Sequence, residues 1–375
     1  STAWPMITGD VKEGGLGFDY KWNMGWMNDF LGYMQCDPYF RNYHYGELTF
    51  SMIYAYSEDF ILVFSHDEVV HGKGSMVNKM PGATFEEKFA NLRTAYGFML
   101  GHPGKKLLFM GQDFGQMDEW NENRELEWNL LQYPIHSQMQ EYVKALNKLY
   151  AKYPALSQMD YHPDGFQWIE CNNAAENIVI FVRRTKKKEE TLLFVCNFAP
   201  VLHEKFQLGV PFAGKYKEIL NSDSEEFGGS GCTNPRVKTS KKEEWNERPD
   251  SIVINVAPMS VSIFTCTPEA PKKAVKKTAA KKETAVKKET AKAAAAEKAA
   301  PKAAEKAAPK KTAAAEKESP EKAALIAHPA EKTGTALAEK EDPKKKAGTA
   351  LAEKEDPKKK AGTALAEKKA PRKKA

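Results

Sequence analysis

The spacing of apolar residues changes near position 154 of this 375-residue chain. Before that point, continuous apolar runs alternate with segments whose apolar residues recur every three or four positions, a pattern typical of strands and amphipathic helices in β/α units. The run Phe60–Phe64 predicts a strand buried on both faces, and residues 107–110 predict another. We therefore expect residues 1–153 to form β/α units around a parallel sheet.

Two helices are predicted around these strands. Thr84 and Glu87 have the spacing of a capping box, and the apolar residues that follow at helical intervals stop before Gly101. A second helical series of apolar residues covers 139–150 and ends before Pro154, because proline cannot continue a helix.

After residue 154 the pattern becomes that of short strands separated by turn-rich segments. We expect six strands, at residues 166–171, 178–184, 191–198, 216–220, 252–256 and 261–265. Residues 154–268 therefore predict an antiparallel all-β domain, a β-sandwich.

Residues 269–375 have a composition that cannot form a hydrophobic core. They contain 30 Lys and Arg against 16 Asp and Glu, a net charge of +14, and no Phe, Tyr, Trp, Met or Cys. Their Gly-Thr-Ala-Leu-Ala-Glu-Lys segment recurs with a 14-residue period from Gly334, Gly348 and Gly362. We expect a disordered tail. The other 26 basic and 34 acidic residues give residues 1–268 a net charge of −8.

No apolar run approaches the roughly 18 residues that a membrane span needs, and no secretory signal precedes the fold. The five cysteines are odd in number, widely scattered and without C-x-x-C spacing, which argues against a disulfide framework or a zinc site. We expect a reduced, cytoplasmic protein that does not bind a membrane.

A polar cluster, Ser65, His66, Asp67 and Glu68, directly follows the first predicted strand. In a parallel β/α fold, side chains at the carboxyl ends of strands meet where active sites form. A carboxylate there can oppose the positive charge of an oxocarbenium-like sugar, and a neutral imidazole can hydrogen-bond a sugar hydroxyl. The alternative is that His66 and Asp67 only form a structural pair at the start of a loop.

A metal site is a further alternative, with His66 and His71 as nitrogen ligands beside Asp67 or Glu68. Because these residues are expected in a loop, their spacing defines no ligand geometry. We therefore expect no metal.

Aromatic residues are concentrated in the first part of the chain. They are Trp4, Phe18, Tyr20, Trp22, Trp26, Tyr39, Tyr43 and Tyr45. Sugar rings have apolar C–H faces that stack on aromatic planes, so a carbohydrate groove would use such residues. The alternative for each is ordinary packing in the core.

Several segments together resemble the glycogen branching enzymes of the alpha-amylase superfamily. The most specific is Ser65-His-Asp-Glu-Val-Val-His-Gly-Lys73. The other matching segments are residues 1–5, 14–18, 21–23, 105–111, 119–121, 180–184 and 220–224. The resemblance covers about residues 1–267, whereas the tail is similar to the Lys/Ala/Pro-rich tails of linker histones.

The resemblance implies that residues 1–153 are the C-terminal part of a (β/α)8 barrel. It also implies a retaining reaction with three carboxylates. Asp67 matches the third, which stabilises the transition state, and His66 matches its sugar-binding neighbour. Glu68, Trp22 and Trp4 are further expected substrate contacts.

The two other catalytic carboxylates implied by the resemblance have no match in this chain. The acid/base Glu would lie immediately ahead of Ser1, and the nucleophilic Asp further upstream. We therefore expect the 375 residues alone to be inactive.

The implied function is that of a 1,4-alpha-glucan branching enzyme in glycogen biosynthesis. Such an enzyme cuts an α-1,4 bond, holds the segment as a covalent glycosyl-enzyme and transfers it to a 6-hydroxyl. The implied partner is an α-glucan such as glycogen or amylose, and no cofactor is implied. Two alternatives stay open: a hydrolytic amylase of the same fold, and a non-catalytic protein that binds polyanions weakly through its tail.

Overall fold

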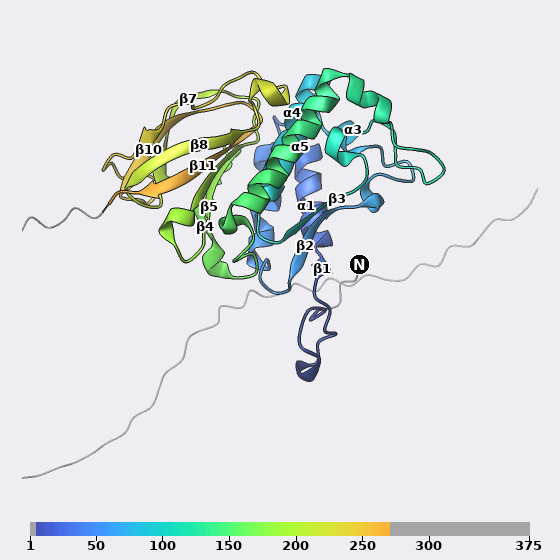
Figure 1. The fold of residues 1–375 in the computed structure, drawn as a ribbon, viewed down its shortest axis with the longest axis horizontal. Coiled ribbons are helices and arrows are strands. Elements are labelled where there is room, and N and C mark those ends of the chain that lie inside the picture. Colours follow the sequence, from blue (N-terminus) through green and yellow to red (C-terminus); the bar gives the residue numbers. More distant parts are fainter. Residues whose placement is uncertain (1–4, 271–375) are drawn as a thin grey trace, which may run out of the picture. The chain divides into compact units, whose positions relative to one another are not determined.

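A computed structural model of the chain describes residues 5–270 (Figure 1). Trp4 lies outside the described residues, as does the predicted disordered tail from residue 271 onward. Between residues 5 and 270, no helix is long and apolar enough to cross a membrane.

The first part of the structure contains a three-stranded parallel sheet in the order β1-β2-β3. Its strands are β1 Lys21–Trp22, β2 Phe60–Phe64 and β3 Lys105–Leu108. β2 confirms the first predicted strand, whereas β3 begins and ends two residues earlier than predicted. Backbone pairing with β2 includes the polar Lys105, and the chain then turns at Gly111, whose φ of 80° favours glycine.

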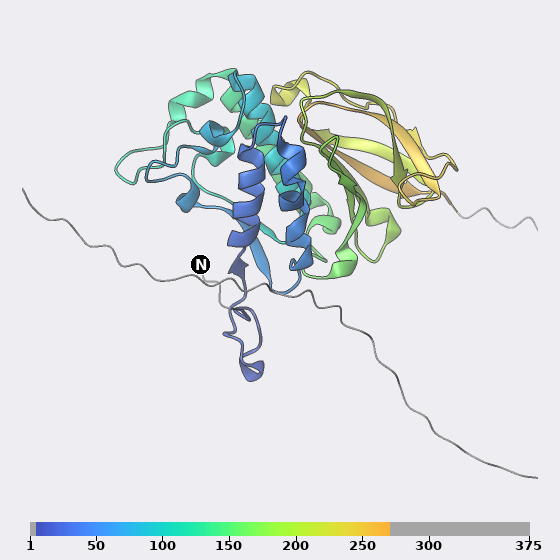
Figure 2. The same cartoon turned by 180° about the vertical axis from the view of Figure 1, so that it is seen from behind.

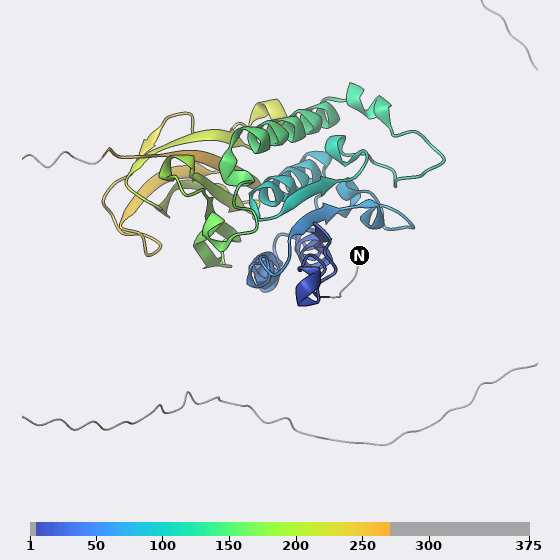
Figure 3. The same cartoon turned by 60° about the horizontal axis from the view of Figure 1, so that its bottom comes forward.

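The helices of this part, within the described residues, are α1 Met24–Gln35, α2 Tyr45–Thr49, α3 Met76–Lys79, α4 Phe85–Gly101 and α5 Pro134–Lys152. The capping box predicted for α4 is confirmed. Thr84 Oγ1 accepts from the N–H of Glu87, and the Glu87 carboxylate accepts from the N–H of Thr84, both at 3.3 Å. Such a cap contributes about 1 kcal/mol to stability. α4 and α5 lie side by side (Figures 1 and 3).

The sequence prediction missed α1, which comes to the front when the molecule is seen from behind (Figure 2). Asn23 caps this helix, because its Oδ1 accepts from the N–H of Trp26 at 2.9 Å. The buried residues of α1 recur at helical intervals, and they are Trp26, Met27, Phe30, Leu31, Tyr33 and Met34. The aromatic residues of this segment also suit a carbohydrate groove, so the sequence alone does not distinguish the helical period from that alternative.

The second part is an antiparallel all-β domain of two sheets. The larger sheet has the order β4-β5-β6-β11-β8-β9, and β10 pairs with β7 in the smaller one. The strands are β4 Phe166–Asn173, β5 Ile178–Arg183, β6 Leu192–Asn197, β7 His203–Val210, β8 Gly214–Asn221, β9 Lys238–Thr239, β10 Asp250–Val256 and β11 Ser260–Pro268. The six predicted strands are confirmed with shifted ends, but β7 and the two-residue β9 were missed. β7 opens with His, Glu and Lys, which weakened its alternating pattern.

The larger sheet is buried on both faces. Ile178, Ile180 and Val182 of β5 belong to a core that also contains residues of β7 and β10. The alternate residues Val179 and Phe181 belong to a second core, which contains residues of α1, α4 and α5. The larger sheet is therefore the middle of three layers.

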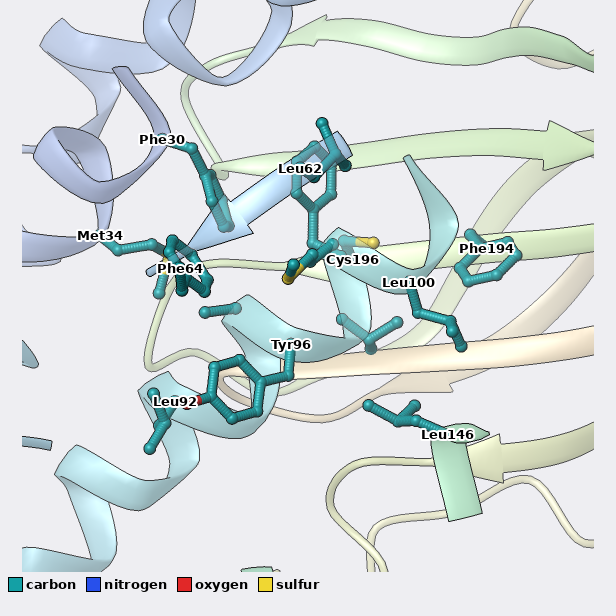
Figure 4. Packing of buried hydrophobic residues seen from close by; sticks show 14 of the residues in the cluster. Phe30, Met34, Leu62, Phe64, Leu92, Tyr96, Leu100, Leu146, Phe194 and Cys196 are labelled. Carbon is teal, nitrogen blue, oxygen red and sulfur yellow. The ribbon is translucent and has the colours of Figure 1, made fainter. Parts of the chain in front are cut away.

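Figure 4 shows part of this second core. Phe30 of α1, Phe64 of β2, Tyr96 of α4, Leu146 of α5 and Phe194 of β6 all belong to it. Complete burial of a large apolar side chain contributes about 1.5–3 kcal/mol. Five elements from both parts of the chain thus stabilise one another through the same core.

Two glycines let α4 approach the middle sheet closely. A Cβ atom on Gly97 would lie 2.9 Å from the Cβ of Val261 in β11. A Cβ atom on Gly101 would lie 2.7 Å from the ring of Phe181 in β5. Both separations are shorter than packed carbon atoms tolerate, so a larger residue would push the helix away from the sheet.

A buried ion pair within the second part also binds side chains of the first part. Arg183 Nη2, at the end of β5, donates to Asp160 Oδ1 at 2.6 Å, and both side chains are fully buried. Lys105 Nζ of β3 lies 3.1 Å from the second oxygen, Oδ2, and the hydroxyl of Tyr150 in α5 donates to it at 3.4 Å. Burial raises the pKa of the Asp160 carboxyl, but the cations around it, Lys106 and Arg183 foremost, hold that pKa below its ordinary value.

Candidate functional site

The polar cluster at residues 65–68 lies at the carboxyl end of β2, where it forms the short 3-10 helix His66–Glu68. Ser65 caps this turn, because its Oγ accepts from the N–H of Asp67 at 3.2 Å. The Glu68 carboxylate accepts from the N–H and the hydroxyl of Ser65, at 2.5 and 2.9 Å. These bonds fix the backbone that carries His66 and Asp67.

His66 and Asp67 remain open to solvent. Nε2 of His66 lies 3.2 Å from Oδ1 of Asp67, and the two side chains are 47% and 51% exposed. The imidazole lies 5.8 Å, between ring centres, from Phe109, the residue after β3. The structure therefore presents an imidazole and a carboxylate side by side, and both can still contact a ligand.

The chain segments that follow β2 and β3 are joined to each other at this edge and leave the sheet on the same side (Figure 1). The N–H of Phe109 donates to the carbonyl of Phe64 at 3.0 Å, and Nε2 of Gln112 donates to the carbonyl of Ser65 at 3.4 Å. The sequence prediction did not select Phe109 or Gln112 as site residues. Gln112 lies just after the predicted strand 107–110, which was the signal that would have found it, whereas Phe109 lies inside that predicted strand and follows β3 only in the structure.

The other predicted sugar contacts are placed differently. Glu68 is only 4% exposed, and its Oε2 is occupied by Ser65, so in this structure it caps the turn instead of facing solvent. Trp22 lies half-buried in β1 and packs against the core. Trp4 lies outside the described residues.

The described part of the chain, residues 5–270, contains no group of three or more His, Cys, Asp or Glu side chains that could hold a metal ion. His71, the second histidine of the metal alternative, is exposed in the loop beyond Asp67 and has a φ of 58°. All five cysteines are free.

The aromatic residues of the first part divide between core and surface. Trp26 and Tyr45 are buried, whereas Tyr39 and Tyr43 are 81% and 79% exposed. Both exposed tyrosines line a cavity of about 970 Å³ whose wall includes the start of α4. This cavity shares no lining residue with the cluster at residues 65–68. We take the cluster at residues 65–68 as the candidate site, because its fixed carboxylate and imidazole meet at the carboxyl end of a parallel strand.

Comparison with known proteins relates most of the described residues to one enzyme family. Residues 168–267 match the family model of the alpha-amylase C-terminal all-beta domain. The chain is 52% identical over 264 residues to a 1,4-alpha-glucan branching enzyme of Shewanella frigidimarina, covering 70% of this chain and 35% of that protein. It is 48% identical over 278 residues to a branching enzyme of Geobacillus stearothermophilus, covering 74% of this chain and 43% of that protein. The chain thus spans less than half the length of these relatives.

Among solved structures, the chain is similar to AmyP in complex with maltose. The TM-score is 0.46 at 12% sequence identity, and the match covers 68% of this chain and 51% of that one.

Proposed function

We propose that this chain, a close relative of the 1,4-alpha-glucan branching enzymes over its aligned residues, supplies one catalytic carboxylate of a retaining glucan transfer. The observation that carries the proposal is the half-exposed His66–Asp67 pair at the carboxyl end of β2. The reaction is proposed from relatives that are about 50% identical to this chain. The geometry of the His66–Asp67 pair supports a role for this pair in that reaction.

In such a transfer, a carboxylic acid protonates the oxygen of an α-1,4 bond while a carboxylate bonds to the sugar carbon that the oxygen leaves. The 6-hydroxyl of a second glucan then displaces that carboxylate and forms the α-1,6 branch, and its proton passes to the group that acted as the acid in the first step. Positive charge develops on the sugar in both steps. A nearby carboxylate stabilises this charge mainly in the transition state, because the bound substrate does not carry it.

We assign this stabilising role to Asp67 and a hydrogen bond with a sugar hydroxyl to His66. Glu68 acts indirectly in the proposal, because its bonds with Ser65 fix the turn that presents both side chains. The nucleophile and the proton donor of the family match no residue of this chain, so neither step is assigned to it.

We also propose that β1, β2 and β3 are consecutive strands of a (β/α)8 barrel. Their parallel pairing in chain order supports this, as does the absence, within residues 5–270, of a further strand beside β1 or β3. The proposed domains are barrel strands and helices in residues 1–153, the all-β domain in 154–268 and the tail in 269–375.

Replacing Asp67 tests the assignment in an enzyme that joins these residues to the family's nucleophile and proton donor. Asp67→Asn should lower kcat on amylose about 100-fold or more, equivalent to about 3 kcal/mol, with little change in KM. New α-1,6 linkages report branching, and new reducing ends without them would indicate the hydrolytic alternative. The exposed Asp118, which pairs with Arg124, supplies the matched control Asp118→Asn. Near-normal turnover by Asp67→Asn would make Asp67 structural.

Tyr39 and Tyr43 are proposed as α-glucan contacts away from the reacting bond. Their exposure beside the cavity supports this, since aromatic planes stack on sugar rings. The double variant Tyr39→Ala with Tyr43→Ala should migrate faster than the unmodified chain in native gels that contain glycogen. Equal retardation of both proteins by glycogen would show that Tyr39 and Tyr43 do not contact the glucan.

Residues 269–375 are proposed to bind polyanions weakly, supported by their net charge of +14. Counterion release drives such binding. When a peptide of residues 269–375 is titrated with duplex DNA, binding at low salt should therefore disappear at physiological salt. Binding that is indifferent to salt, or no binding at low salt, would contradict this. The cytoplasm stays the predicted location.

A further inference from the structure

The loop beyond Asp67 wraps around one carboxylate. Gly72 and Gly74 have φ angles of 80° and 75°, in the left-handed region that favours glycine. Their N–H groups both point at Glu119, which follows β3. The N–H of Gly72 donates to Oε2 at 3.0 Å, and the N–H of Gly74 donates to Oε1 at 2.5 Å. Converging backbone amides of this kind form a concave site for an anion, and here a side chain of the same chain occupies it.

The charge on Glu119 matches this arrangement. The amides of Gly74 and Gly72 hold the pKa of the Glu119 carboxyl below its ordinary value. Lys79 and His71 act in the same direction through their positive charge. The lowered pKa favours the carboxylate form of Glu119, and both of its oxygens accept from one loop.

Lys73, which lies between the two glycines, connects this loop to the catalytic cluster. Its Nζ donates to the backbone carbonyl of Asp67 at 2.7 Å. A second cation, Lys79, donates to the backbone carbonyl of Lys73. A continuous series of contacts thus leads from Glu119 through the loop to the backbone of Asp67.

The residue after Glu119 holds the other side of the same loop. The N–H of Trp120 donates to the carbonyl of Val69 at 3.0 Å. Its ring meets Phe109 edge-on with 5.2 Å between ring centres, and Phe109 in turn contacts His66. Two adjacent residues after β3 therefore contact the loops and rings that support both members of the His66–Asp67 pair.

We propose that Glu119 is a positioning residue for catalysis, one that holds the loop at residues 69–74 so that Asp67 faces the reacting sugar. This inference rests on the proposed function, because it assumes that Asp67 stabilises the transition state. Glu119 itself touches no reacting atom in this scheme. Its loss should therefore lower the rate of the chemical step more than it weakens glucan binding.

The test compares four variants with the unmodified protein, in the enzyme described above for Asp67. Glu119→Gln removes the charge at nearly constant shape, and Glu119→Asp retains the charge. Glu125→Gln makes the same chemical change at an exposed glutamate of the same connection and serves as the control. Gly72→Ala leaves Glu119 intact but strains the loop, because a φ of 80° is unfavourable for alanine. A Cβ atom there would meet nothing within 4 Å, so the variant adds no steric clash.

Glu119→Gln and Gly72→Ala should each lower kcat roughly tenfold to a hundredfold, the cost of misplacing a catalytic group by about 1 Å. KM should stay within about twofold, because ground-state binding does not depend on the position of Asp67. Glu119→Asp should retain more kcat than Glu119→Gln, and Glu125→Gln should behave like the unmodified protein. In the 375-residue chain, the amide proton resonances of Gly72 and Gly74 should shift in Glu119→Gln and stay in place in Glu125→Gln.

Asp67→Asn is measured in parallel and separates the two ideas. If Asp67→Asn keeps its turnover, the proposed function fails, whatever Glu119 does. If Asp67→Asn is inactive while Glu119→Gln and Gly72→Ala turn over like the control, the positioning role is overturned. The same follows if kcat falls only in proportion to the fraction of unfolded protein.

Discussion

The Asp160–Arg183 pair and the His66–Asp67 pair both join a carboxylate to a nitrogen base, but only the second is open to a ligand. Asp160 and Arg183 are fully buried, and the Asp160 oxygens also contact Lys105 and Tyr150. His66 and Asp67 are each about half exposed. The difference teaches that a fully partnered carboxylate in the interior connects elements, whereas a carboxylate with a fixed backbone and a free face is available for chemistry.

The largest expected effect on stability comes from breaking the buried pair. Asp160→Asn leaves Arg183 as a buried cation without its carboxylate, which should lower the free energy of unfolding by about 3–5 kcal/mol. Urea denaturation measures it. In the exposed pair Asp118–Arg124, Asp118→Asn should cost at most about 1 kcal/mol. Equal losses of unfolding free energy in the two variants would show that the buried pair does not stabilise the fold more than the exposed pair does.

Acid should weaken the stabilising effect of the buried Asp160–Arg183 pair. The folded-state pKa of Asp160 is depressed, so its stabilising contribution is fully present above the unfolded pKa of about 4. It is lost as the pH falls through the lower, folded-state pKa. Unfolding free energies measured at successive pH values below about 4 should therefore fall more steeply for the unmodified chain than for Asp160→Asn. Parallel curves would contradict a depressed pKa at Asp160.

The smallest effect is expected for the imidazole of the open pair. His66→Ala should raise KM for glucan roughly twofold to tenfold, because one hydrogen bond contributes about 0.5–1.5 kcal/mol to binding. Its kcat should fall less than in Asp67→Asn, and its stability should change little. His44, an exposed histidine paired with Glu47, provides the control His44→Ala. An unchanged KM in His66→Ala would remove His66 from the substrate contacts.

Sequence reasoning predicted the elements whose signal is local. The run Phe60–Phe64 and the capping box at Thr84 required only neighbouring residues, and both are confirmed. β7 was missed because its stability comes from pairing with β10, whose paired residues lie 40 to 53 positions further along the chain, and not from its own polar first half. The three-layer arrangement also could not be predicted from local patterns. Continuous apolar strands show that both faces of the sheet are covered, but they do not show which elements cover them.

The candidate site shows the same limit. The position of Asp67 after a buried strand followed from the sequence, and its catalytic assignment stays a proposal. Glu68 was expected to contact substrate, yet its side chain turns inward to cap the turn. The link between Glu119 and the loop joins residues about 45 positions apart through two backbone amides, which leave no mark in a residue pattern.

The close approach of α4 to the middle sheet limits how such a protein can change by recombination. Gly97 lies against Val261, and Gly101 lies against Phe181. An all-β domain taken from a distant protein would bring other side chains against these glycines, leaving either a clash or an unfilled void. Exchange of the all-β domain without α4 should therefore be selected against. We expect the two contacting surfaces to be exchanged together.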